Sequence, residues 1–325
     1  MFLVVLGHVL GATYGIGGYD SVLGSVLLTF RMPMFFFISG YIAYKAVERW
    51  SVGFYIENMR KKAKVQIIPT IFFFSLFSLC MGGNPLSVFE YGFGGYWFTI
   101  VLFEMFIIYY TLSLVGRYTS RKIVDVGLIT LSVIGVICLI FLRNDSRLWN
   151  VLCLENLTKY FQFFAFGILC RKYGEVFIGY MKSDRFRAVI ILLFIGCLLL
   201  YFDDGFKESV PLLYKAVHDI IVRYAGLLVV FIFFLSNETY FQSGARASKM
   251  LQFIGRRTLD IYLLHYLFLP DMQYLKPYIE SSDMIILQLF LSLFVAALII
   301  ALCLFVSAVI RTSPLLAHYL FGAKR

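Results

Sequence analysis

A histidine and an arginine, His8 and Arg31, lie within the first two apolar stretches of the chain. An ionisable side chain at a membrane helix centre costs at least ~2.5–3.5 kcal/mol, so each is a candidate functional residue. Both are equally far from a tight turn near Tyr19–Asp20, so an antiparallel helical hairpin would place them at the same depth. A neutral imidazole beside a fixed guanidinium could act as a general base next to a clamp for an anion or oxyanion.

Five more residues inside apolar stretches complete the set of candidates: Glu104, Asp219, Arg223, His218 and His265. Asp219 and Arg223 are four positions apart and therefore share a helix face. They either form a self-contained ion pair or bind an acceptor molecule, whereas His218 points elsewhere. His265 is expected close to the outer face of the membrane, as a hydrogen-bonding anchor or as a site residue.

Glu104 lies in the fourth apolar stretch, where a buried carboxylate needs a partner. It could orient His8, pair with Arg31 or contact the acceptor. Tyr96 and Trp97 begin the same stretch. They are typical of the aromatic belt at a membrane surface, and the sharper alternative is that Trp97 stacks on a sugar ring.

A basic run, Arg60-Lys61-Lys62-Ala63-Lys64, separates two apolar stretches, and Arg256–Arg257 form a second basic pair. Such residues set the orientation of membrane helices. Coenzyme A carries several phosphates, so either group could also attract it electrostatically. No Walker loop or dinucleotide fingerprint supports nucleotide binding independently.

These candidates are positioned by ten apolar blocks in a chain of 325 residues that is 61% hydrophobic and only 15% charged. Backbone polar groups in lipid must be satisfied within each segment, so the blocks are expected to be helices. We predict an all-α membrane protein of about ten transmembrane helices, forming a single domain over residues 1–325. The blocks are Met1–Gly18, Ser21–Tyr44, Val65–Met81, Tyr96–Val115, Ile123–Leu142, Leu157–Cys170, Ala188–Phe202, Ala216–Leu235, Leu251–Leu269 and Met284–Ile310.

The basic residues alternate loop by loop, with 21 on the side of the even-numbered loops and C-terminal tail and 6 on the other. The positive-inside rule then places both termini in the cytoplasm. This distribution also explains the net charge of +10 without nucleic acid, which we exclude as a partner. The six cysteines are far apart and show no metal-ligand or disulfide spacing, so we expect small packing residues and no metal site.

Four segments resemble the acyltransferase-3 family of membrane O-acyltransferases. VVLGHV (Val4–Val9) and FRMPMFFFISGY (Phe30–Tyr41) are similar to the opening of that family, and together they are fairly specific. GYWFTIVLF (Gly95–Phe103) and FIGRRTLDIYLLH (Phe253–His265) resemble a later helix start and the penultimate helix. Family members usually carry a basic residue about ten positions before the histidine, whereas this chain begins seven positions before it. We expect a truncated N-terminus, and the alternative is that this copy lacks the basic residue.

The resemblance implies transfer of an acyl group, usually acetyl from acetyl-CoA, to a hydroxyl of a sugar, polysaccharide or other envelope acceptor. It implies His8 as the catalytic histidine and Arg31 as the arginine of the second helix. Acyl-CoA would be a co-substrate rather than a permanently bound cofactor, and the location would be the plasma or inner membrane. Two rival hypotheses are a transporter or flippase of a lipid-linked sugar, which usually shows internal repeats not found here, and a non-catalytic membrane scaffold or sensor.

Overall fold

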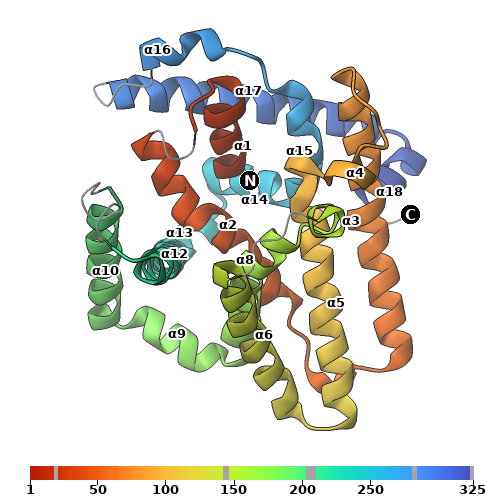
Figure 1. Cartoon of the computed structure of the whole chain (residues 1–325), viewed down its shortest axis with the longest axis vertical. Coiled ribbons are helices and arrows are strands. Elements are labelled where there is room, and N and C mark those ends of the chain that lie inside the picture. The colour runs from red at the N-terminus through yellow and green to blue at the C-terminus, as the bar shows by residue number, and fades with distance from the viewer. Residues whose placement is uncertain (18–20, 142–145, 203–209, 280–283, 323–325) are drawn as a thin grey trace. The chain divides into compact units, whose positions relative to one another are not determined.

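The computed structural model describes residues 1–17, 21–141, 146–202, 210–279 and 284–322. Every regular element within these ranges is a helix (Figure 1), which confirms the all-α class. The predicted turn near Tyr19–Asp20 lies outside the described residues. Six of the described helices are long and apolar enough to cross a membrane: α2 (Val22–Ala43), α3 (Val52–Cys80), α5 (Trp97–Tyr118, extended by the 3-10 turn Gly94–Tyr96), α6 (Arg121–Phe141), α12 (Leu212–Ser236) and α17 (Ile285–Ile310).

The other four predicted blocks form shorter or interrupted helices. Block nine is divided by a break at Arg257, and block one changes from α- to π-helix after His8. The chain is therefore a multi-pass membrane protein, while the count of about ten spans and the cytoplasmic termini remain predictions. The helices are α1 (Phe2–His8) with η1 (Val9–Thr13), α8 (Leu154–Lys172), α10 (Asp184–Phe202), and α14 (Arg246–Arg256) with α15 (Thr258–Leu264) and η4 (His265–Phe268).

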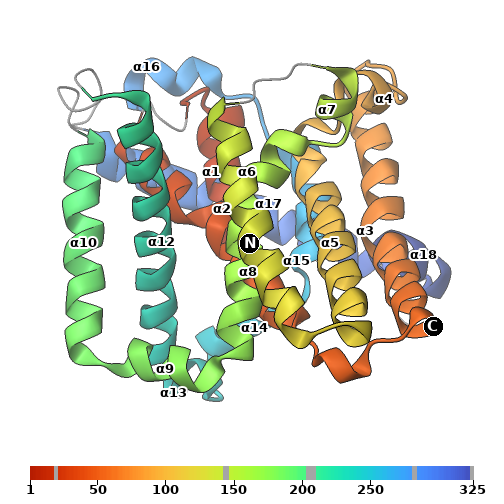
Figure 2. The same ribbon diagram turned by 60° about the horizontal axis from the view of Figure 1, so that its bottom comes forward.

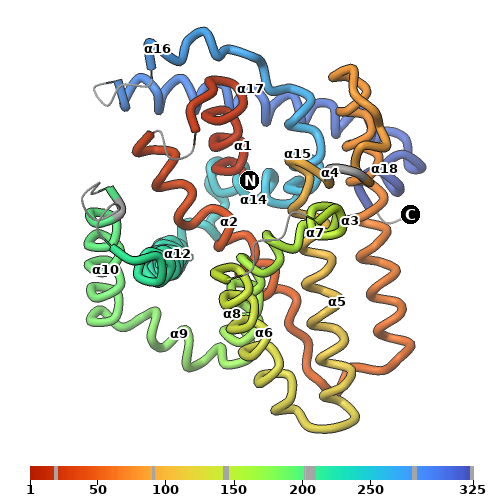
Figure 3. The backbone as a smooth tube through the Cα atoms, viewed as in Figure 1, coloured from red at the N-terminus to blue at the C-terminus, as the bar shows by residue number. Residues whose placement is uncertain are grey.

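The chain divides into two compact units. Unit 1 comprises Met1–Met34 and Tyr173–Val306, and unit 2 comprises Phe35–Lys172 and Ser307–Arg325. The chain leaves unit 1 in the middle of α2, after Met34, and returns after α8 (Figure 3).

Unit 1 holds the first two helices together with the second half of the chain. Helices α10 and α12 run side by side (Figure 2), and Gly226 of α12 permits close contact with Phe194 of α10 and Phe30 of α2. The backbone N–H of Met272 donates to the carbonyl of Thr13 at 2.9 Å, which ties the segment after η4 to the end of η1. The remaining elements of unit 1 are α9 (Gly174–Lys182), α13 (Glu238–Gln242), η5 (Gln273–Leu275), α16 (Lys276–Ile279) and most of α17.

Unit 2 is a bundle in which α5 packs against α3, α6 and α8. Its core is aromatic, because the side chains of Phe73, Tyr109, Phe163 and Phe164 are fully buried between these helices. Large rings suit this position because they bury much apolar area and interlock at tilted or edge-to-face angles. The short elements of unit 2 are η2 (Val47–Arg49), α4 (Val88–Tyr91), η3 (Gly94–Tyr96), α7 (Arg147–Val151) and α18 (Pro314–Phe321).

Two glycines allow the backbones of α2 and α8 to touch within unit 2. A Cβ added at Gly40 would collide with the carbonyl oxygen of Phe164, and one added at Gly167 would collide with that of Phe37. Small residues at such crossings are typical of membrane helices, which associate through close packing rather than through the hydrophobic effect.

We expect Gly167→Ala to destabilise the protein, since the obstructing atom is backbone and cannot move aside. Overpacking typically costs about 1–3 kcal/mol, which corresponds to a fall in melting temperature of about 2–10 °C. Thermal melting of purified protein in nanodiscs measures this effect. Gly196→Ala in α10 is the matched control because the position has open space around it. Equal melting of the two variants would show that the crossing is not tightly packed.

Candidate functional site

His8 lies where the first helix changes its winding. Helix α1 ends at His8, and the next five residues, Val9–Thr13, form a π-helix. Short π-helical turns are rare and often occur at functional sites, because the extra residue re-aims the neighbouring side chains. The local backbone therefore already distinguishes His8 from an ordinary residue of an apolar helix.

Two aromatic residues from the other end of unit 1 contact the imidazole of His8. The hydroxyl of Tyr266 is 3.0 Å from Nε2 of His8, and the two ring centroids are 5.0 Å apart. The ring of His265 lies 5.1 Å from that of His8 and 4.1 Å from that of Tyr266. Both residues come from η4, which begins where α15 tightens into a 3-10 turn. His8, His265 and Tyr266 thus form one cluster, which we call the imidazole cluster.

His265 is held in one orientation by its own helix. Its Nδ1 is 2.7 Å from the carbonyl oxygen of Tyr262 and 3.1 Å from that of Ile261. Carbonyl oxygens only accept, so Nδ1 carries the proton and Nε2 carries the lone pair. The side chain is 0% exposed, and its Nε2 has no hydrogen-bond partner among the described residues. A buried acceptor without a donor is uncommon in a purely structural role.

Arg31 approaches the same cluster from α2. Its guanidinium lies against the backbone of Gly7, in space that any side chain at position 7 would fill. Because Gly7 directly precedes His8, the positive charge lies beside the imidazole cluster. The structure therefore brings His8, Arg31 and His265 together within unit 1.

Asp219 and Arg223 form an ion pair on α12. Nε of Arg223 is 2.6 Å from Asp219, and its Nη1 donates to the carbonyl of Leu28 at 3.3 Å. The Arg223 side chain is only 6% exposed, whereas that of Asp219 is 40% exposed. Asp219 and Arg223 thus pair with each other, which is the first of the two alternatives expected from the sequence. Acceptor binding by these residues stays a prediction. His218 instead contacts the carbonyl of Cys197 at 3.0 Å.

The remaining membrane candidates lie in unit 2. Glu104 is on α5, and its Oε2 is buried without a hydrogen-bond partner within the described part of the chain. Trp97 begins α5 and stacks on Tyr160, with centroids 5.6 Å apart and planes 14° apart. Tyr96 is 1% exposed, so it belongs to the core of unit 2 rather than to an exposed aromatic belt.

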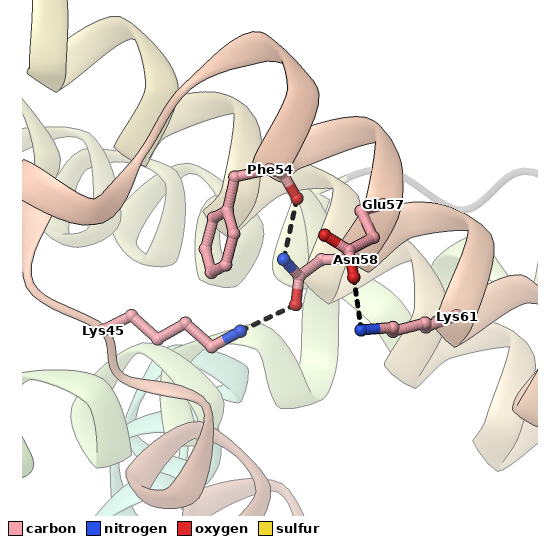
Figure 4. Close-up of polar contacts among 5 residues, drawn as sticks. All are labelled: Lys45, Phe54, Glu57, Asn58 and Lys61. Atoms are coloured by element: carbon pink, nitrogen blue, oxygen red, sulfur yellow. Dashed lines mark hydrogen bonds and ion pairs between the residues drawn. The ribbon is translucent and has the colours of Figure 1, made fainter. Parts of the chain in front are cut away.

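Basic residues gather at the start of α3, also in unit 2. Lys45 donates to Asn58 at 2.7 Å and lies over the ring of Phe54, while Lys61 pairs with Glu57 at 2.5 Å (Figure 4). Partial burial, and then the nearby charges of Lys61 and Arg49, lower the pKa of Lys45. The charges of Lys61 and Arg49 repel that of Lys45, so a bound anion would relieve this repulsion.

A shallow hollow of about 770 Å³ opens beside this group and is lined by Glu57, Arg60, Lys61 and Lys64. Lys62 points differently, because its ammonium lies 3.7 Å from the centroid of the Phe106 ring. We call Lys45, Arg49, Arg60, Lys61 and Lys64 the basic cluster.

The second basic pair belongs to unit 1. Arg257 is 3.4 Å from the buried carboxylate of Asp260, while Arg256 is exposed. Within the described ranges, no group of three or more His, Cys, Asp or Glu side chains could hold a metal ion.

Tyr266 is the site residue that the sequence analysis missed. Nothing distinguishes it in the sequence from the other 21 tyrosines except that it directly follows His265. Only the tertiary contact with His8, 258 positions away, identifies it.

Comparison with known proteins identifies a family. A family model described as an acyltransferase domain, Acyl_transf_3, matches residues 1–310 and so includes the imidazole cluster, Arg31 and the basic cluster. Searches of curated proteins and of solved structures return no significant match. On the extent of the family match, the chain belongs to the acyltransferase-3 family and is a membrane acyltransferase.

Proposed function

We propose that this protein transfers an acyl group from acyl-CoA to a hydroxyl of an envelope carbohydrate, with His8 as the general base. The acyl group that we propose is acetyl. The observation that supports this most is the 3.0 Å contact between Nε2 of His8 and the hydroxyl of Tyr266, beside the guanidinium of Arg31. A general base must be held within about 2.6–3.2 Å of the acceptor atom whose proton it takes, and the Tyr266 contact holds Nε2 in place so that Nδ1 can be that base.

The proposed reaction follows from these groups. The acceptor hydroxyl attacks the thioester carbonyl while its proton passes to His8. The carbonyl oxygen becomes negative and is stabilised by Arg31. When the C–S bond breaks, the CoA thiolate leaves and takes the proton from the imidazolium. The products are the acyl ester and free CoA, and His8 returns to its neutral form.

Purified protein in nanodiscs tests the reaction. With acetyl-CoA and an extract of neutral envelope polysaccharide, we expect release of free CoA thiol that depends on the acceptor, together with the acetyl ester on the polysaccharide by mass spectrometry. A translocating protein or a scaffold would consume no thioester. Absence of acceptor-dependent thiol release across envelope fractions would therefore contradict the proposal.

We further propose that Tyr266 is a positioning residue. The Nε2–H of His8 donates to the hydroxyl oxygen of Tyr266, which leaves the lone pair on Nδ1 of His8 and so selects a tautomer that can act as a base. Tyr266→Phe should lower kcat about tenfold, as expected for one neutral hydrogen bond of up to about 1.5 kcal/mol, and should leave KM nearly unchanged. Tyr240→Phe, on the exposed part of α13, is the matched control. An unchanged kcat in the Tyr266 variant would remove Tyr266 from the mechanism.

For the donor, we propose that the basic cluster binds the phosphates of coenzyme A. The hollow has the size of a typical ligand pocket, roughly 300–1,000 Å³, and three of its basic side chains lie on one face of α3. The Lys61–Glu57 pair does not prevent this, because both side chains are well exposed and such pairs contribute little. Arg256–Arg257 is the second candidate for the same role.

Removing two of these charges should weaken donor binding without changing the chemical step. In Arg60→Ala/Lys61→Ala, we expect KM for acetyl-CoA to rise about tenfold while kcat changes little. The KM of the wild type should also rise with ionic strength, because exposed charges are screened by salt. Arg185→Ala removes an exposed arginine outside both basic groups and serves as the control. An unchanged KM in the double variant would move the donor site elsewhere.

A further inference from the structure

A small pocket in unit 2 has a lining unlike that of the surrounding apolar helices. It lies where the start of α5 meets α7 and the start of α8, and its volume is about 180 Å³. It contains two of the three tryptophans of the chain. Its main side chains are Trp97, Trp149, Asn150, Cys153, Glu155 and Asn156, which we call the indole pocket.

The polar groups of the pocket suit a ligand rich in hydroxyls. Asn150 and Asn156 each offer an amide donor and an acceptor, and Glu155 offers a carboxylate acceptor. No lysine or arginine lines the pocket, so a phosphate or carboxylate ligand would find a negative charge and no cation. Burial raises the pKa of Cys153 to about 11, which favours the neutral thiol over the reactive thiolate.

The two indoles differ in what they already contact. Trp97 uses one face for its stack with Tyr160. Trp149 is half-buried and makes no ring contact within the described residues, although it forms part of the pocket wall. An unstacked indole beside amides is an apolar platform with polar groups at its edge, which is the combination that a sugar ring needs for its C–H face and its hydroxyls.

The wall that carries Trp149 is fixed by several contacts. A Cβ at Gly92 would lie 2.5 Å from the carbonyl oxygen of Asn150, and Gly92 has φ +81°, so α7 approaches the chain before α5 very closely. Nε of Arg147 donates to the carbonyl of Phe89 at 2.6 Å. Cys153 has φ 51° and is the one non-glycine residue with positive φ among the described residues. Such strain persists where surrounding structure enforces it and is frequent at binding sites.

We propose that the indole pocket binds one ring of a neutral carbohydrate, with Trp149 as the stacking platform and Asn156 as a hydroxyl partner. Its volume is below the roughly 300 Å³ of pockets for drug-sized ligands, which favours a single ring over an oligosaccharide. The inference rests on the proposed function, because it supplies a binding site for the carbohydrate that the acyl group is transferred to.

Sugar binding can be measured directly by tryptophan fluorescence, because the chain has three tryptophans and two of them line the pocket. Trp50→Phe removes the buried tryptophan outside the pocket, so both remaining fluorophores report on the pocket. In nanodiscs, we expect a saturable change in tryptophan emission with galactose, glucose or N-acetylglucosamine, and at least tenfold weaker binding of glucose 6-phosphate. Dextran tests whether a ring within a neutral polymer binds as well as a free sugar does.

Variants in the same background locate the site. Asn156→Ala keeps both indoles and should weaken the affinity for sugar at least fivefold. Trp149→Ala should weaken the affinity at least tenfold, measured through the emission of Trp97. Leu148→Ala changes the exposed neighbour of Trp149 and should bind like the parent. Thermal melting shows whether each variant is folded, so that weak binding is compared only between folded proteins.

The sugar-binding measurement and the CoA-release assay test the indole pocket and the proposed reaction independently of each other. No saturable response to any neutral sugar, or equal affinity in the parent and the folded Asn156 variant, would overturn the indole pocket whether or not the protein releases CoA. Sugar binding in a protein that releases no CoA would support the pocket while contradicting the proposed transfer. His8→Ala should bind sugar like the parent, because His8 does not line the pocket.

Discussion

Replacing His8 by alanine should lower kcat for acyl transfer by about 10²–10⁴-fold, the range that a positioned general base contributes. The variant keeps Tyr266, His265 and Arg31 but loses the imidazole whose Nε2 lies 3.0 Å from the Tyr266 hydroxyl. KM values for the donor and the acceptor should change far less, because the basic cluster and the indole pocket do not contain His8. Thiol release under saturating acetyl-CoA and polysaccharide measures the effect.

His218→Ala is the matched control for the His8 variant. It also removes a histidine from an apolar helix of unit 1, and its Nε2 lies 3.0 Å from the carbonyl oxygen of Cys197. We expect its kcat to stay within about threefold of the parent, because losing a single neutral hydrogen bond away from the reacting groups has a small effect. If the His8 variant retained the activity of the His218 variant, the assignment of the base would be wrong.

The sequence was sufficient to predict the class of the fold and the position of His8 beside Arg31. Long apolar blocks form helices in lipid because every backbone N–H and C=O must be hydrogen-bonded within the segment. The equal distance of His8 and Arg31 from one turn is a property of a hairpin and needs no knowledge of distant contacts. In the structure, the Arg31 guanidinium lies against Gly7, the residue before His8.

The sequence could not predict the rest of the imidazole cluster. Hydropathy treats the ninth block as continuous, yet the helix breaks at Arg257 and tightens into a 3-10 turn at His265. That turn, together with the hydrogen bond from Met272 to Thr13, brings residues separated by more than 250 positions into contact. Contacts of this kind depend on the packing of the whole unit, which residue spacing does not encode.

The role of Glu104 was left open by the sequence for a related reason. A carboxylate in an apolar block signals that a partner is needed but does not say which one. Its Oε2 is buried without a hydrogen bond among the described residues of unit 2, so a substrate or donor group remains a candidate partner. The indole pocket shows the converse case. Asn150 and Asn156 carry no sequence signal, and Asn156 joins Trp149 in the pocket because α7 packs against α8.

Arg31→Met should lower kcat by about 10²–10³-fold, the usual effect of removing a donor that stabilises an oxyanion. Arg31→Lys should recover part of this loss but not all of it. Lysine restores the charge but not the planar fork that contacts two oxygens in a fixed direction. Arg187→Lys, at the start of α10, is the matched control and should have the activity of the parent. Equal kcat in Arg31→Met and the parent would show that the guanidinium does not act on the transition state.

The contact with Gly7 allows a stricter test of the same assignment. A methyl group at position 7 would occupy the space of the Arg31 guanidinium, so Gly7→Ala should displace the charge and lower kcat by about tenfold or more in the parent. If that loss arises through Arg31, Gly7→Ala should have almost no further effect in the Arg31→Met background, because two changes that act on one interaction are not additive. Full additivity would mean that Gly7→Ala acts by disturbing the helix around His8, and that the position of the guanidinium is not what the active site depends on.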